Sequence, residues 1–156
     1  MTQVTAYTNE GRYKCLEDLP IDSAELSLGY CGWEQCYPGH RFGPNKRASY
    51  ALHIIANGKG KLEKNGEVFY LTTGDAFLLC PEEEAWYEAD KKEPWTYAWI
   101  GLYGYKVKKI MQYAGFSKEK SVRSLKCTAL LKSYVDEILE VHRLTTEESM
   151  RRNGYL

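Results

Sequence analysis

The chain has 156 residues, enough for one domain with a hydrophobic core of its own. Its 21 basic and 21 acidic residues give a formal charge of zero, which argues against a chain that grips a polyanion such as DNA by itself. No apolar stretch has the length of a membrane span or the form of a signal peptide, and the five cysteines have no paired spacing. We therefore expect a reduced, cytoplasmic protein without membrane contact.

Residues 1–24 are polar with scattered tyrosines, and they predict an irregular N-terminal arm. Residues 25–102 are different, because short apolar runs alternate there with turn signals. Asn65-Gly66 within "GKLEKNGEVFYL" predicts a tight hairpin, since both residues tolerate positive φ. The expected strands occupy 25–37, 49–56, both sides of the hairpin in 60–71, 76–80, 85–89 and 93–102, with a turn-rich connection over 38–47. Strands without intervening helices predict an antiparallel sandwich or barrel.

The hydrophobic period changes after residue 102, so residues 103–156 predict a helical region. One helix is expected in "YKVKKIMQYAG" and a longer one over 128–143. The longer helix has more apolar positions than one packed face needs, and the spare stripe predicts a dimer interface; the alternative is a helix packed wholly within its own domain. The candidate dimerisation residues are Leu131, Tyr134, Val135, Ile138 and Val141. Thr145 and Glu148 have capping-box spacing, so we expect a third helix to begin there within a longer protein.

Residues for catalysis or metal binding do not gather in the sequence. A metal-binding barrel of the cupin type needs several convergent ligands, whereas the three histidines, His40, His53 and His142, lie far apart. The run Glu82-Glu83-Glu84 is interpreted as a solvated loop rather than an acid/base pair. We therefore expect no enzyme activity, no metal and no cofactor.

Three stretches carry a family resemblance. "RASYALHIIANGKG", "LTTGDAFLLCPEEEAWYEAD" and "PWTYAWIGLYG", in this order and spacing, resemble the N-terminal effector-binding domain of AraC-family transcriptional regulators. The resemblance covers about residues 26–143 and is closest to bacterial regulators of sugar operons, such as those for raffinose or melibiose.

The resemblance implies a mostly β, cupin-like antiparallel jelly-roll barrel without metal over residues 25–102, followed by two to three C-terminal helices. It implies a small carbohydrate effector inside the barrel, an arm that folds over it, and a homodimer formed through the 128–143 helix. DNA would bind only through a helix-turn-helix domain that this chain lacks.

The strand over 93–102 places three large rings on one face, because side chains alternate along a strand. The resemblance implies that Trp99 stacks on a sugar ring and that Tyr97 offers it a hydrogen bond. The remaining candidate ligand-binding residues are Tyr87, Arg47, His53 and Trp95. The alternative for Trp99 and Tyr97 is plain core packing, and for Trp95 it is a position that covers the barrel mouth. For His53 the alternative is a structural histidine, and for Arg47 a surface ion pair.

Two other functions remain open on the sequence alone. A small cupin-fold sugar isomerase or epimerase would bind metal or turn over substrate. A stand-alone carbohydrate-binding module would lack any DNA-binding domain.

Overall fold

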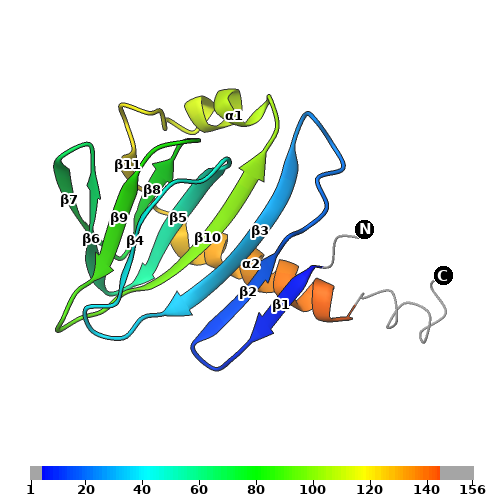
Figure 1. The fold of residues 1–156 in the computed structure, drawn as a ribbon. Helices are drawn as coiled ribbons and strands as arrows, with labels where there is room; N and C mark the ends of the chain where they lie inside the picture. Colours follow the sequence, from blue (N-terminus) through cyan, green and yellow to red (C-terminus); the bar gives the residue numbers. More distant parts are fainter. Residues whose placement is uncertain (1–4, 145–156) are drawn as a thin grey trace.

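Residues 5–144 are described by the computed structural model, and they form two antiparallel β-sheets with two helices (Figure 1). The larger sheet has the strand order β1-β2-β3-β10-β5-β8-β11 and the smaller one β4-β9-β6-β7. The strands of the larger sheet are β1 (Ala6–Asn9), β2 (Tyr13–Glu17), β3 (Ser27–Gln35), β5 (Tyr50–Asn57), β8 (Asp75–Leu79), β10 (Thr96–Tyr103) and β11 (Val122–Ser124). Those of the smaller sheet are β4 (Arg41–Asn45), β6 (Lys59–Lys64), β7 (Glu67–Thr72) and β9 (Ala85–Ala89).

The expected fold class, a mostly β, cupin-like jelly roll followed by helices, is confirmed. The hairpin between β6 and β7 is confirmed as well, because Asn65 and Gly66 have φ values of 52° and 77°. Both expected helices exist as α1 (Val107–Tyr113) and α2 (Thr128–Leu144). The third predicted helix lies outside the described residues. No helix within residues 5–144 is long and apolar enough to cross a membrane.

The expectation of an irregular arm is wrong for residues 6–17. Its β1 and β2 form a hairpin that extends the larger sheet, and β2 pairs with β3 from Tyr13 opposite Glu34 to Leu16 opposite Cys31. The connection over 38–47 likewise contains β4, which pairs with β9.

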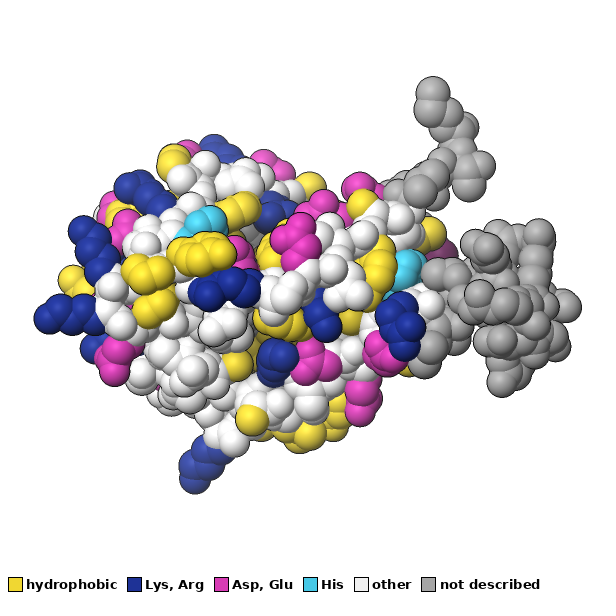
Figure 2. Space-filling model, turned by 90° about the horizontal axis from the view of Figure 1, so that it is seen from below, with side chains coloured by type: hydrophobic (Ala, Val, Ile, Leu, Met, Phe, Trp, Pro, Cys, Tyr) yellow, Lys and Arg dark blue, Asp and Glu magenta, His cyan; other side chains and the backbone are white. Residues whose placement is uncertain are grey.

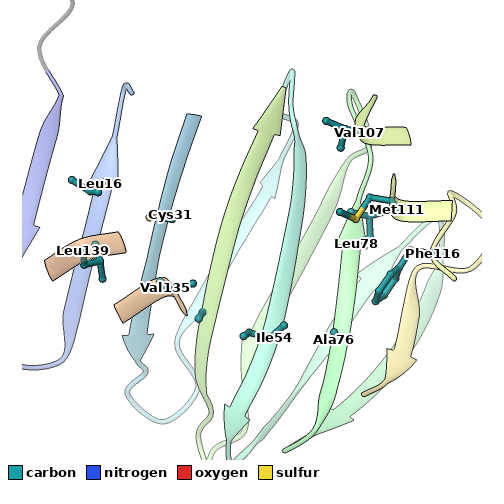
Figure 3. Close-up of a cluster of buried hydrophobic side chains, with 11 residues drawn as sticks. Leu16, Cys31, Ile54, Ala76, Leu78, Val107, Met111, Phe116, Val135 and Leu139 are labelled. Carbon is teal, nitrogen blue, oxygen red and sulfur yellow. The ribbon is translucent and has the colours of Figure 1, made fainter. Parts of the chain in front are cut away.

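Two clusters of buried side chains lie on opposite faces of the larger sheet. The outer cluster joins the sheet to both helices: Val107 and Met111 of α1 and Val135 and Leu139 of α2 pack toward it (Figure 3). The inner cluster lies between the two sheets and is rich in aromatic rings, including Phe77, Tyr87, Trp95 and Tyr97. Strands β5, β8 and β10 contribute to both clusters, which explains why they are apolar on both faces.

Glu83 does not belong to a solvated loop, contrary to the expectation for the run 82–84. Its carboxylate lies 2.8 Å from the Lys64 ammonium, and both side chains are almost fully buried. The second oxygen of Glu83 accepts a hydrogen bond from the Cys80 amide. A buried charge is tolerated only when it is paired in this way, so the loop is fixed to β6.

Candidate functional site

A cavity of about 270 Å³ opens between the sheets toward the N-terminal hairpin. Strands of both sheets supply its walls, and the side chains combine aromatic rings with charged groups. The lining residues are Tyr13, Glu17, Tyr30, Glu34, His40, Phe42, Arg47, His53, Tyr87, Tyr97 and Trp99. Its volume lies just below the range of about 300–1,000 Å³ that is usual for small-molecule sites. The cavity therefore suits a compact ligand.

Trp99 occupies the centre of one row of side chains across the larger sheet. In the strand pairing it lies opposite Gly32 of β3 on one side and His53 of β5 on the other, and His53 lies opposite Phe77 of β8. A Cβ atom on Gly32 would come within 2.6 Å of the indole, so only glycine leaves room for the ring in this position. Trp99 is half-buried and thus still exposes part of its ring to the cavity.

His53 is a neutral hydrogen-bonding residue in the wall of the cavity. Its ring stacks on Phe77 at 4.4 Å between centroids with an angle of 7° between the planes. Burial, together with the positive charge of Arg47, lowers the pKa of His53 to about 3. Its Nδ1 atom is buried and has no hydrogen-bond partner within the described part of the chain. Leaving a buried polar atom unpaired is costly, which makes this imidazole a candidate hydrogen-bond partner for a ligand.

Tyr97 and Tyr87 place two phenols beside this imidazole. The ring centroids of Tyr97 and Tyr87 lie 5.8 and 5.0 Å from the centroid of the His53 ring. The Tyr97 hydroxyl is 3.5 Å from a carboxylate oxygen of Glu34, its cross-strand neighbour. Burial is the main cause that raises the pKa of each hydroxyl above its usual value. Both phenols therefore remain protonated donors at neutral pH.

Arg47 follows β4 and contributes the positive charge of the site. Its guanidinium lies 4.9 Å from the centroid of the Tyr30 ring and 5.5 Å from that of Phe42. No ion pair among residues 5–144 engages it, so the alternative of a surface ion pair for Arg47 is not supported. Its planar set of N–H donors is available at the edge of the cavity.

Trp95 is the one candidate ligand-binding residue that the structure does not place on the cavity wall. Its side chain is 1% exposed and packs within the inner cluster beside Tyr87 and Tyr97. The indole fills the space over Gly60, where a Cβ atom would come within 2.4 Å of the ring. Trp95 thus packs behind Tyr87 and Tyr97 within the inner cluster. The expectation that it contacts the ligand is corrected.

The candidate dimerisation residues on α2 divide into two groups. Val135 is buried, and Leu131 and Ile138 line an apolar crevice between the helix and the larger sheet. Val135 attaches α2 to its own domain, which corrects its assignment to a dimer interface, while for the partly buried Leu131 and Ile138 that assignment stays a prediction. Tyr134 and Val141 point outward with exposed fractions of 49% and 57%. Leu130, which was not among the candidates, is 52% exposed beside them.

Six lining residues were missed by the sequence analysis: Tyr13, Glu17, Tyr30, Glu34, His40 and Phe42. A signal existed for two of them, because Tyr30, Gly32 and Glu34 alternate on one face of a predicted strand. Tyr13 and Glu17 could not be found without the hairpin that brings β2 beside β3.

The arrangement is suited to binding an uncharged, hydroxyl-rich molecule. Aromatic faces can cover the apolar C–H surface of such a molecule. Its hydroxyl groups can form hydrogen bonds with the carboxylates of Glu17 and Glu34, the two phenols, the imidazole and the guanidinium. Within residues 5–144, no three His, Cys, Asp or Glu side chains converge to hold a metal ion.

Comparison with known proteins agrees with this geometry. A family described as the AraC-like ligand binding domain matches residues 27–150. The Msm operon regulatory protein of Streptococcus mutans serotype c is 39% identical over 101 residues, which cover 65% of this chain and 36% of the relative. The raffinose operon transcriptional regulatory protein RafR of Pediococcus pentosaceus is 38% identical over 94 residues, covering 59% of this chain and 33% of the relative. The chain thus matches about one third of the length of these regulators.

This chain is also similar to a solved structure, in fold alone. The protein YhaK from Escherichia coli superimposes with a TM-score of 0.53 at 17% identity, over 79% of this chain and 52% of that protein.

Proposed function

Because the chain belongs to the family of AraC-like ligand-binding domains, we propose that it senses a small carbohydrate and thereby controls the DNA binding of a helix-turn-helix domain elsewhere in a longer regulator. The observation that carries the proposal is the wall of the cavity around Trp99, where a half-exposed indole lies beside the unpartnered Nδ1 of His53. A pyranose has an apolar face for the indole and hydroxyl groups for the imidazole. Such a regulator would act in the cytoplasm, where the DNA is.

The names of the relatives support regulation rather than catalysis. Both are regulatory proteins of operons, and one is named for the raffinose operon. Binding alone is enough for this function, and the described residues provide donors, acceptors and rings without a converging set of metal ligands.

The N-terminal hairpin connects the cavity to α2 and supports a route for the signal. Tyr13 and Glu17 of β2 line the cavity, while the Tyr7 ring of β1 lies 5.4 Å from the ring of His142 near the end of α2. A change in β2 on ligand binding would thus be transmitted through β1 to α2. We infer that the hairpin of β1 and β2 corresponds to the N-terminal arm of this family. Binding of the effector would draw this hairpin closer to the cavity.

The outward face of α2 supports a homodimer. Leu130 and Tyr134 lie four residues apart and thus on one side of the helix, each about half exposed. Two such faces packed together would bury apolar surface that a single domain leaves in water.

The test of the proposed function is calorimetry of the 156-residue chain against a panel of neutral mono-, di- and trisaccharides, with sugar alcohols as controls. One saccharide should bind with a stoichiometry of one per chain. If no member of the panel binds, while a metal ion or a non-carbohydrate binds in this cavity, the proposal is wrong.

A further inference from the structure

The charges of this neutral chain are distributed unevenly. Residues 104–126, which comprise α1, the following loop and β11, hold seven of the 21 Lys and Arg residues but only one of the 21 acidic residues, Glu119. On the face shown in Figure 2, by contrast, basic and acidic side chains are interspersed. The seven basic residues are Lys106, Lys108, Lys109, Lys118, Lys120, Arg123 and Lys126, and all are exposed.

The two parts of this segment lie against each other in space. Lys108 of α1 and Lys118 of the loop line the same groove of about 400 Å³. At the other end of α1, the Arg123 guanidinium donates a 2.6 Å hydrogen bond to the carbonyl of Ala114. The helix and the loop therefore lie side by side and together carry the seven basic residues, and we call this region the α1–β11 surface.

This surface is held in a fixed shape. The buried Lys64 ammonium, which pairs with Glu83, also donates a 2.9 Å hydrogen bond to the Lys118 carbonyl and another to the Ser121 hydroxyl. Both ends of the turn from Lys118 to Ser121 are thus attached to β6. Because the backbone is fixed, a polyanion would bind without first having to order the loop.

Most of the positive charge is not neutralised by the fold. Lys106 pairs with Glu25, but no ion pair within residues 5–144 engages Lys108, Lys109 or Lys120. Concentrated, unpaired lysines repel one another, and the negative charge of a row of phosphates would relieve that repulsion. The counterions released from the phosphates would favour binding further.

We propose that the α1–β11 surface contacts the phosphate backbone of duplex DNA, independently of base sequence. The choice of DNA as the polyanion rests on the proposed function, because a regulator keeps DNA close to every one of its domains. Such contacts would add affinity beside the sequence-specific contacts made by the rest of the regulator.

The experiment measures binding of the 156-residue chain to a fluorescent duplex of mixed sequence by anisotropy over a series of salt concentrations. The test variant is Lys108→Gln/Lys109→Gln/Lys120→Gln. The control is Lys59→Gln/Lys91→Gln/Lys92→Gln, which removes the same charge from exposed lysines on β6 and the β9–β10 turn. Circular dichroism and saccharide calorimetry on all three proteins check the fold and the effector site.

The parent should bind weakly at low salt, with an affinity that falls steeply as salt rises. The test variant should bind at least about tenfold more weakly, and the slope of log affinity against log salt should flatten by about 0.9 for each phosphate that the variant no longer neutralises. The control should behave like the parent.

Three results would overturn the proposal: no binding by the parent at low salt, equal losses in both variants, or equally tight binding to poly-glutamate, which would point to an acidic protein instead. If saccharide binds but DNA does not, this proposal fails while the proposed function stands. If DNA binds but no saccharide does, the proposed function fails instead.

Discussion

Trp99 presents its ring to the cavity, and Gly32, opposite it in the strand pairing, leaves room for the indole. Replacement by alanine removes the apolar platform but leaves the polar wall in place. We predict that Trp99→Ala weakens saccharide binding at least about tenfold, equivalent to about 1.4 kcal/mol. Calorimetry measures the change.

Trp86→Ala is the matched control, because that indole lies outside the cavity beneath Arg41, whose guanidinium carbon is 3.9 Å from the ring centroid. Equal affinity of Trp99→Ala and the parent would exclude a stacking role for Trp99.

Gly32 makes the position of the Trp99 ring possible. A Cβ atom there would approach the Lys14 carbonyl to 2.5 Å and the indole to 2.6 Å. We predict that Gly32→Val displaces the ring, abolishes measurable saccharide binding and lowers the free energy of unfolding by about 1–3 kcal/mol. Chemical denaturation and calorimetry give both quantities. Gly11→Ala, where a Cβ atom would meet no atom within 4 Å, should change neither.

His53 gives the stability of the protein a pH dependence. The pKa of His53 is lowered to about 3 from an ordinary value of 6.5. Between these two pH values, His53 is protonated in the unfolded chain but neutral in the native protein. Stability from this residue is therefore complete above pH 6.5 and is lost as the pH falls toward 3. Between pH 7 and pH 5 the loss should reach about 2 kcal/mol.

The measurement is urea denaturation at several pH values. His53→Gln cannot titrate at this position, so its stability should fall less over the same interval. Parallel pH profiles for the two proteins would contradict a neutral, buried His53.

At the scale of elements, α2 has two faces with different tasks. Val135 and Leu139 attach the helix to the larger sheet, whereas Leu130 and Tyr134 face outward. We predict that Tyr134→Glu converts a dimer into a monomer in analytical ultracentrifugation. Because the Tyr134 side chain is 49% exposed, the midpoint of thermal unfolding of the variant should equal that of the dissociated parent chain.

Val135→Asp is the contrasting variant, and it should unfold the domain because it buries an unpaired charge. If the parent is a monomer at every concentration, or if Tyr134→Glu remains a dimer, α2 does not form the interface through this face.

At the scale of the whole molecule, local signals predicted most of the fold. Asn65-Gly66 predicted its hairpin because the turn is determined by two residues, and the helical period predicted α1 and α2. The hairpin of β1 and β2 could not be predicted, since both strands are short and β2 depends on its pairing with β3. Pro44 and two flanking turn residues similarly concealed β4, which is an edge strand.

The candidate site was predictable only where its residues lie on strands with a clear pattern. The candidate residues that line one cavity are Tyr97, Trp99, Tyr87, His53 and Arg47, and their contact with a ligand stays a prediction. Trp95 could not be separated from them by alternation, because its burial depends on the space above Gly60, on another strand. Glu34 enters the site through its pairing opposite Tyr97, which depends on strand order rather than on local sequence.

The most direct test is a crystal structure of the chain soaked in the saccharide that calorimetry identifies. We expect one sugar ring between the sheets, with its C–H face on the Trp99 indole and a hydroxyl group donating a hydrogen bond to Nδ1 of His53. A saccharide bound only elsewhere on the protein, with this cavity unchanged, would contradict the account that these strands enclose an effector.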